Sequence, residues 1–64
     1  MPHIQITLLE GRTPDQKRRI AERVTETMVE EAGTQHEGVS ISFIEVPPTD
    51  FARAGVLAVD KGRK

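Results

Sequence analysis

Residues 13–33 read TPDQKRRIAERVTETMVEEAG and contain the signals of one complete helix. Thr13 is a typical N-cap residue, and Gln16, three positions later, completes a capping box. Gly33 is a typical residue for ending a helix, because glycine adopts left-handed backbone conformations without steric cost. Between these signals, apolar residues recur at helical spacing, at Ile20, Ala21, Val24, Met28, Val29 and Ala32. The sequence therefore predicts a helix over residues 14–32 with one apolar face.

The segments on either side of this helix have the pattern of β-strands. Residues 3–9, HIQITLL, alternate between two kinds of side chain, with His3, Gln5 and Thr7 on one side and Ile4, Ile6 and Leu8 on the other. Residues 39–46, VSISFIEV, are rich in β-formers, and one face carries Val39, Ile41 and Phe43. Pro47 and Pro48 end this second strand. Strands joined through a long helix cannot form a tight hairpin, so we expect a right-handed crossover between parallel strands.

The C-terminal part of the sequence is weakly patterned. Phe51 begins a short segment that Gly55 interrupts, and residues 56–59, VLAV, are apolar. These four residues are expected to form either a small strand or a contact between subunits. We expect the last four residues, 61–64, to be frayed.

The size of the chain limits what can hold it together. It has 64 residues and no cysteine, which excludes disulfide bonds and thiolate chemistry. A chain of this length buries only about 60% of the surface that its unfolded form exposes. One β-α-β unit also leaves a sheet face and both sheet edges uncovered. We therefore expect a single α+β domain over residues 1–64 that assembles with other copies.

The charge balance excludes two kinds of partner. Nine Lys and Arg against ten Asp and Glu give a net charge of −1, which provides no field to attract nucleic acid or an anionic membrane. No apolar run approaches the roughly 18 residues of a transmembrane helix, and the first residues lack the apolar core of a signal peptide. We expect a cytoplasmic protein.

The charges of the helix oppose its dipole, which favours acidic residues first and basic residues last. The first half carries basic residues, at Lys17, Arg18, Arg19 and Arg23. The last half carries acidic residues, at Glu26, Glu30 and Glu31. Two copies packed antiparallel across a two-fold axis would set each basic half beside an acidic half. The alternative is a solvated face with local pairs such as Arg18 with Glu22.

The first candidate for chemistry is Pro2. Removal of Met1 would leave Pro2 with a free secondary amine, which is both a base and a nucleophile. Free α-amino groups have a pKa of about 7.7–8.0, and an apolar site or nearby cations lower the pKa of such a group. The amine would then act as a general base near neutral pH. The alternative is that Pro2 merely precedes an edge strand.

Other candidates lie in turns and in the C-terminal segment. Arg12, in the turn before the helix, is suited to hold a carboxylate, although an arginine in a turn is more often solvated. Phe51 is suited either to the core or to the apolar wall of a site, and Arg53 faces the same way if the segment is extended. His3 and His36 have no spaced partner ligands, so we expect no metal site. The serines of the second strand, Ser40 and Ser42, lack the His and acid of a nucleophilic triad and are interpreted as polar alternates.

These residues together resemble the 4-oxalocrotonate tautomerase family. The resemblance rests on Pro2, the strand over residues 4–9, the segment Leu9-Glu10-Gly11-Arg12, the capped helix with Gln16-Lys17, and Phe51 at its distance from Arg12. It covers nearly the whole chain, and short chains with an initial proline are typical of the family. The resemblance implies a β-α-β fold with a C-terminal β-hairpin, assembled as a trimer of dimers. It also implies an amino-terminal proline base, with no metal or organic cofactor.

The resemblance implies roles for individual residues. Pro2 corresponds to the catalytic proline, Arg12 to the arginine that holds a substrate carboxylate, and Phe51 to the apolar residue that keeps the proline amine neutral. Ser40 stands where enzymes of the family that act on dicarboxylates have a second arginine. Residues 52–55, Ala-Arg-Ala-Gly, replace a glycine-rich turn, and Arg53 is a candidate substitute for the arginine missing at position 40.

We therefore expect an enol–keto tautomerase that acts on a 2-hydroxydienoate or a related enol of a 2-oxo acid. Its small-molecule substrate would carry a carboxylate. One alternative is a hydratase or dehalogenase of the same superfamily, for which Asp60 is the only acid after Phe51. The other alternative is a non-catalytic assembly or small-molecule-binding subunit of a homo-oligomer or hetero-oligomer.

Overall fold

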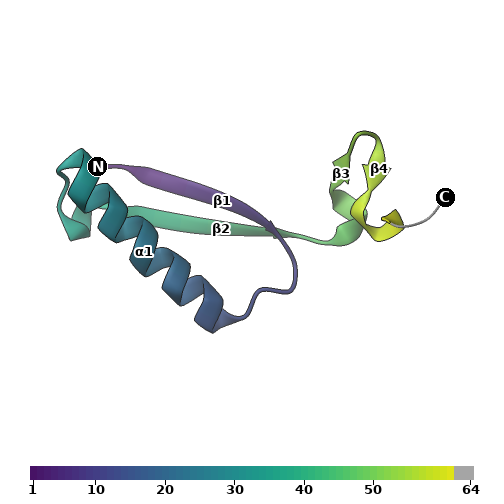
Figure 1. Cartoon of the computed structure of the whole chain (residues 1–64), viewed down its shortest axis with the longest axis horizontal. Helices are drawn as coiled ribbons and strands as arrows, with labels where there is room; N and C mark the ends of the chain where they lie inside the picture. Colours follow the sequence, from purple (N-terminus) through teal and green to yellow (C-terminus); the bar gives the residue numbers. More distant parts are fainter. Residues whose placement is uncertain (62–64) are drawn as a thin grey trace.

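The computed structural model describes residues 1–61 (Figure 1). The elements follow one another as β1 (His3–Leu9), α1 (Pro14–Ala32), β2 (Ser40–Val46), β3 (Ala52–Arg53) and β4 (Val56–Leu57). Short 3₁₀ turns lie at His36–Gly38, Pro48–Asp50 and Ala58–Asp60. The expected fraying concerns residues 61–64, of which residues 62–64 lie outside the described residues. Lys61 is described, and its backbone N–H donates to the Ala58 carbonyl oxygen at 3.1 Å.

β1 and β2 form the parallel pair that the sequence predicts. Ile4 lies opposite Ile41 and Ile6 opposite Phe43, so the apolar sides of the two strands coincide. The side chains on this face are half-buried, whereas their neighbours along β1 are exposed. β2 begins one residue later than expected, because the backbone N–H of Val39 donates to the His36 carbonyl oxygen in the preceding turn.

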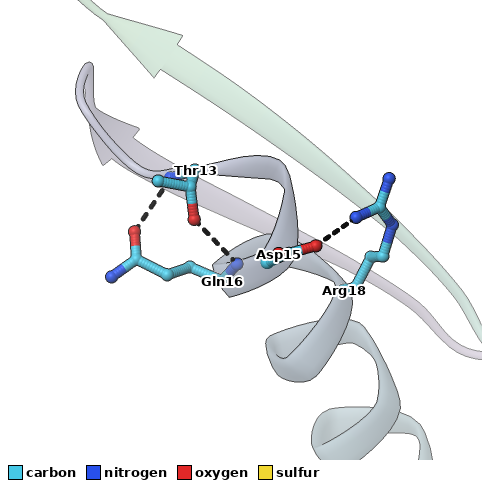
Figure 2. Close-up of polar contacts among 4 residues, drawn as sticks. All are labelled: Thr13, Asp15, Gln16 and Arg18. Atoms are coloured by element: carbon cyan, nitrogen blue, oxygen red, sulfur yellow. Dashed lines mark hydrogen bonds and ion pairs between the residues drawn. The ribbon is translucent and has the colours of Figure 1, made fainter.

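α1 has the predicted bounds and the predicted caps. The backbone N–H of Gln16 donates to Thr13 Oγ1 at 3.1 Å, and the backbone N–H of Thr13 donates to Gln16 Oε1 at 2.8 Å (Figure 2). Gly33 ends the helix in the left-handed region with φ 70°, and its N–H donates to the Val29 carbonyl oxygen. The helix ends are therefore specified by local sequence.

Polar side-chain contacts connect α1 to the elements beside it. Lys17 Nζ lies 2.9 Å from Glu45 Oε2 at the end of β2, and His36 Nε2 lies 2.8 Å from Glu26 Oε2. Arg18 pairs with Asp15 one turn earlier (Figure 2), in place of the local pair with Glu22 that the sequence suggested. Asp15 is the acidic residue of the first turn, where the helix dipole stabilises a negative charge.

The C-terminal segment contains the expected hairpin. β3 and β4 pair antiparallel with Arg53 opposite Val56, so the loop consists of Ala54 and Gly55. Both loop residues have positive φ, 55° and 80°, as a two-residue type I′ turn requires. The hairpin lies beyond the carboxyl ends of β1 and β2, at the opposite end of the chain from the N-terminus (Figure 1).

The chain is extended for its size. Its radius of gyration is 15.2 Å, whereas a compact domain of this length has about 11 Å. Its accessible surface is 5123 Å², about 1,000 Å² more than a compact monomer of this mass exposes. None of the residues 1–61 is fully buried, and the exposed large apolar residues include Ile44, Phe51, Val56, Leu57 and Val59. Within the described residues, no helix is long and apolar enough to cross a membrane.

Candidate active site

Pro2 lies at the amino end of the strand pair. Its side chain is half-buried, and its carbonyl oxygen accepts a hydrogen bond from the backbone N–H of Ser40 at 3.1 Å. This bond places Pro2 beside the first residue of β2. Met1 precedes it and is fully exposed. While Met1 is attached, the Pro2 nitrogen belongs to a tertiary amide and has no basic lone pair.

A polar cluster borders Pro2 on the same end of the sheet. His3 Nδ1 lies 2.7 Å from Ser40 Oγ, and His3 Nε2 lies 3.1 Å from Ser42 Oγ. The sequence alone suggested that His3 lacks partners and that both serines are surface alternates of a strand. The register of the parallel strands brings these side chains together, because His3 lies opposite Ser40. That register was the signal that would have predicted the contacts.

Phe51 and Arg53 lie at the other end of the molecule. Both line a cleft of about 330 Å³ together with Leu9, Val56 and Leu57. The backbone of Phe51 is fixed there because its carbonyl oxygen accepts from the Ala58 N–H at 2.8 Å. The residue is 37% exposed, so it presents apolar surface to whatever approaches the cleft.

Arg12 lies in the turn between β1 and α1. It lines a groove of about 290 Å³ with Gln16, Ile20 and two further arginines, Arg19 and Arg23. Within the described part of the chain, none of these three arginines forms an ion pair with an acid. An uncompensated positive groove of this kind suits a carboxylate. Sequence analysis assigned Arg12 to this role and did not assign Arg19 or Arg23.

The expected site residues therefore fall into two groups. Pro2 and Ser40 lie at the amino end of the strand pair, whereas Arg12, Phe51 and Arg53 follow its carboxyl end. A strand advances about 3.3 Å per residue, so the seven residues of β1 separate the two groups by about 23 Å. One chain does not bring them together.

Two further features lie outside these groups. A larger hollow, of about 730 Å³, follows α1 beside the contact between Glu26 and His36 and contains none of the expected site residues. Among residues 1–61, no three His, Asp or Glu side chains are grouped as metal ligands would be.

Comparisons with known proteins agree with this fold. The family described as "Tautomerase enzyme" matches residues 2–61. The 2-hydroxymuconate tautomerase of Comamonas testosteroni is 40% identical over 63 residues, which cover 98% of this chain and 100% of that protein. TomN, a 4-oxalocrotonate tautomerase homologue of the tomaymycin biosynthetic pathway, superposes with a TM-score of 0.91 at 33% identity, covering 94% of this chain and 92% of TomN.

A third relative is a heterohexamer 4-oxalocrotonate tautomerase from Chloroflexus aurantiacus, with a TM-score of 0.91 and 28% identity over 95% of this chain and 98% of that one. Fold and similarity together define an isomerase that moves a proton within its substrate. The chain belongs to the tautomerase family, and it is a 4-oxalocrotonate tautomerase-like enzyme.

Proposed function

We propose that this enzyme converts a 2-hydroxydienoate, or a related enol of a 2-oxo acid, to its keto form. The observation that carries the proposal is that Pro2 follows Met1 directly and stands at the start of β1 in a chain of the tautomerase family. After removal of Met1, the Pro2 nitrogen takes the proton of the enol hydroxyl. The electrons of that O–H bond form the carbonyl, and the π electrons of the enol double-bond system shift to a carbon of the diene, where they bind the returning proton. No atom is gained or lost.

The other site residues bind and shield the substrate. Arg12 holds the carboxylate through charge-assisted hydrogen bonds of its guanidinium group. Phe51 provides an apolar wall, which disfavours the charged ammonium and so lowers the pKa of the Pro2 amine. A neutral amine at working pH is what a general base requires.

We propose that the site forms between copies of the chain. Its two groups lie about 23 Å apart along β1, and the cleft beside Phe51 is bordered by exposed apolar residues. The Pro2 of one copy would meet the Arg12 and Phe51 of another. The extended shape and the incomplete burial of each chain support this assembly.

A trimer of dimers with antiparallel helices is the assembly that we propose. It would place the acidic half of one helix beside the basic half of its mate, where Arg19 and Arg23 form no ion pair with residues 1–61 of their own chain. The alternative is a hetero-oligomer, and the Chloroflexus aurantiacus relative is described as a heterohexamer. Sedimentation at micromolar concentration should detect an oligomer, and a folded monomer would contradict the proposal.

The proline mechanism is tested at the terminus itself. Mass spectrometry of the natively expressed protein should show a chain that starts at Pro2. Chemical blocking of that amine should reduce ketonisation by about 10²–10⁴-fold, the usual contribution of a general base. Full activity with a blocked terminus or a retained Met1 would rule the mechanism out. A chain that retains Met1 and assembles normally would instead indicate a non-catalytic subunit.

A further inference from the structure

An ion pair joins α1 to the strand pair, and the mechanism proposed above does not use it. Lys17 Nζ lies 2.9 Å from Glu45 Oε2, with 26% and 36% of the two side chains exposed. Within residues 1–61, no other side-chain hydrogen bond or ion pair links α1 to β1 or β2. The contacts that Arg18 and Glu26 make with their partners leave more than half of each side chain exposed. Solvent and salt therefore screen the pair between Lys17 and Glu45 less than they screen those contacts.

The charge of Lys17 does not stabilise the helix itself. Lys17 is the fourth residue of α1, and the positive end of the helix dipole repels a cation in the first turn. Glu45, the residue before the last of β2, offsets this repulsion through the ion pair. The charge of Lys17 therefore contributes to the attachment of α1 to β2, and not to the stability of an isolated helix.

The pair closes a ring of contacts around the turn between β1 and α1. On one side of this turn, the backbone N–H of Glu10 donates to the Val46 carbonyl oxygen at 3.0 Å. On the other side, the backbone N–H of Lys17 donates to the Thr13 carbonyl oxygen at 3.1 Å. Glu45 and Val46 are the last two residues of β2, so both sides of the turn are anchored to adjacent residues of one strand.

The residues between these two anchors are Gly11 and Arg12. Gly11 lies at φ 123°, where its lack of a Cβ is needed, and a glycine gives the turn more backbone freedom than another residue would. The groove of Arg12 is lined by residues of α1, among them Gln16 and Ile20. This groove moves with the start of α1, so its place relative to β2 depends on the apolar packing of the helix and on the pair of Lys17.

β2 also leads to the other substrate-facing residue of the same end. Phe51 follows β2 after the turn at Pro48–Asp50. In the proposed function, Arg12 and Phe51 face one substrate, so the helix and the strand must keep a fixed relation. Glu45 stands where the helix that carries the groove meets the strand that leads to Phe51.

We propose that Lys17 and Glu45 are positioning residues, which act through Arg12 and do not contact the substrate. Their ion pair holds the start of α1 against β2, and so it holds the Arg12 guanidinium where it binds the substrate carboxylate. The proposal rests on the proposed function, because it takes Arg12 as the carboxylate-binding residue.

The size of the effect follows from the exposure of the pair. A partly exposed ion pair favours one arrangement over another by a factor of up to about five. The apparent affinity for a substrate falls with the fraction of chains in the binding arrangement, whereas a saturating substrate selects that arrangement. Loss of the pair should therefore raise KM by about two- to fivefold and leave kcat nearly unchanged. A general loss of folded enzyme would lower kcat instead.

The test measures KM and kcat of the assembled enzyme for a monocarboxylate 2-hydroxydienoate. Lys17→Met removes the charge and keeps an apolar stem, so it should raise KM by about two- to fivefold. Lys17→Arg keeps a cation and should keep KM. Lys17→Glu combined with Glu45→Lys reverses the pair and should return KM to within about twofold of the wild-type value. Arg18→Met is the matched control, because it removes the same charge from the neighbouring position, whose partner Asp15 lies within α1.

A combination with Arg12→Ala shows whether the pair acts through Arg12. If it does, Lys17→Met should leave the KM of the Arg12→Ala enzyme unchanged. The proposal would be overturned by an equal rise of KM in both backgrounds or by a KM that Lys17→Met does not change. A fall of kcat alone, the same rise of KM in Arg18→Met, or loss of assembly in Lys17→Met would overturn it as well.

A measurement without turnover separates this proposal from the proposed function. In NMR relaxation experiments on the assembled protein, Lys17→Met should lower the backbone order parameters of Gly11 and Arg12, whereas Arg18→Met should leave them unchanged. Absence of turnover by the wild-type enzyme would contradict the proposed function. Order parameters of Gly11 and Arg12 that Lys17→Met does not change would contradict the positioning role, whether or not the enzyme turns over.

Discussion

The two ends of the β1–β2 strand pair carry different chemistry. At the amino end, Pro2 stands beside a cluster of uncharged hydrogen-bonding side chains built on His3 and Ser40. At the carboxyl end, Arg12 lines a groove with Arg19 and Arg23, which form no ion pair within residues 1–61, and Phe51 lines an apolar cleft. The strand length keeps these ends apart, so the proposed base and the proposed carboxylate-binding group of one chain cannot meet on one small substrate.

This difference supports the proposed assembly of a chain in which none of residues 1–61 is fully buried. In that proposal each end is only half of a site, and the apolar surface around Phe51 and Leu57 is left exposed by residues 1–61. Burial of that surface between copies would stabilise the oligomer and complete the site in the same step. Folding, assembly and activity are then coupled, and variants at either end should affect them differently.

Among the substitutions, the largest effect on kcat/KM is expected at the carboxyl end of the strand pair, at Arg12. Arg12→Ala should raise KM and lower kcat/KM by about ten- to a hundredfold, because a charge-assisted contact to the carboxylate is lost. Arg18→Ala is the control, since Arg18 pairs with Asp15 and does not line the groove of Arg12. Steady-state kinetics that show equal effects of the two substitutions would place the carboxylate elsewhere.

A second effect concerns the amino end. With Ser40 at the start of β2, kcat/KM for a monocarboxylate 2-hydroxydienoate should equal or exceed that for its dicarboxylate analogue. Ser40→Arg should raise kcat/KM for the dicarboxylate about tenfold or more, because it adds a charged contact. Arg53→Ala tests whether the hairpin already provides that contact. A strong wild-type preference for the dicarboxylate that persists in Arg53→Ala would contradict this account of specificity.

The smallest effect concerns the hairpin that presents Phe51. Ala54 adopts φ 55°, a left-handed conformation that costs a residue with a Cβ about 1 kcal/mol. Ala54→Gly should therefore raise the free energy of unfolding by up to about 1 kcal/mol in urea titrations of the oligomer. Gly55→Ala, at φ 80°, should lower it. If Ala54→Gly lowered the free energy of unfolding and Gly55→Ala raised it, the turn would have another conformation in solution.

The helix and the strand pairing could be predicted from the sequence because local signals specify them. Thr13, Gln16 and Gly33 act within one turn of their partners, and they fixed both ends of α1. The alternation of β1 placed its apolar side correctly, which the half-buried face confirms. The hairpin came from the family resemblance, since the C-terminal sequence is weakly patterned.

The site was harder to predict because its parts are distant in sequence. The contact between His3 and Ser40 depends on the exact register of two strands that are 37 residues apart. The suggested partner of Arg18, Glu22, was wrong. Asp15 and Glu22 both lie at helical spacing from Arg18, and the sequence does not show which of them forms the ion pair. The separation of Pro2 from Phe51 depends on the position of the hairpin relative to the strand pair. The periodicity of the sequence does not predict that position.

The central claim, that one copy supplies Pro2 and another supplies Arg12, is tested most directly by complementation. A chain with a blocked terminus and an Arg12→Ala chain, each nearly inactive, are unfolded, mixed in equal amounts and refolded together. If the site forms between copies, random mixing completes about a quarter of the sites, and activity should rise far above the sum of the separate preparations. Activity equal to that sum, from oligomers shown to contain both chains, would contradict the account.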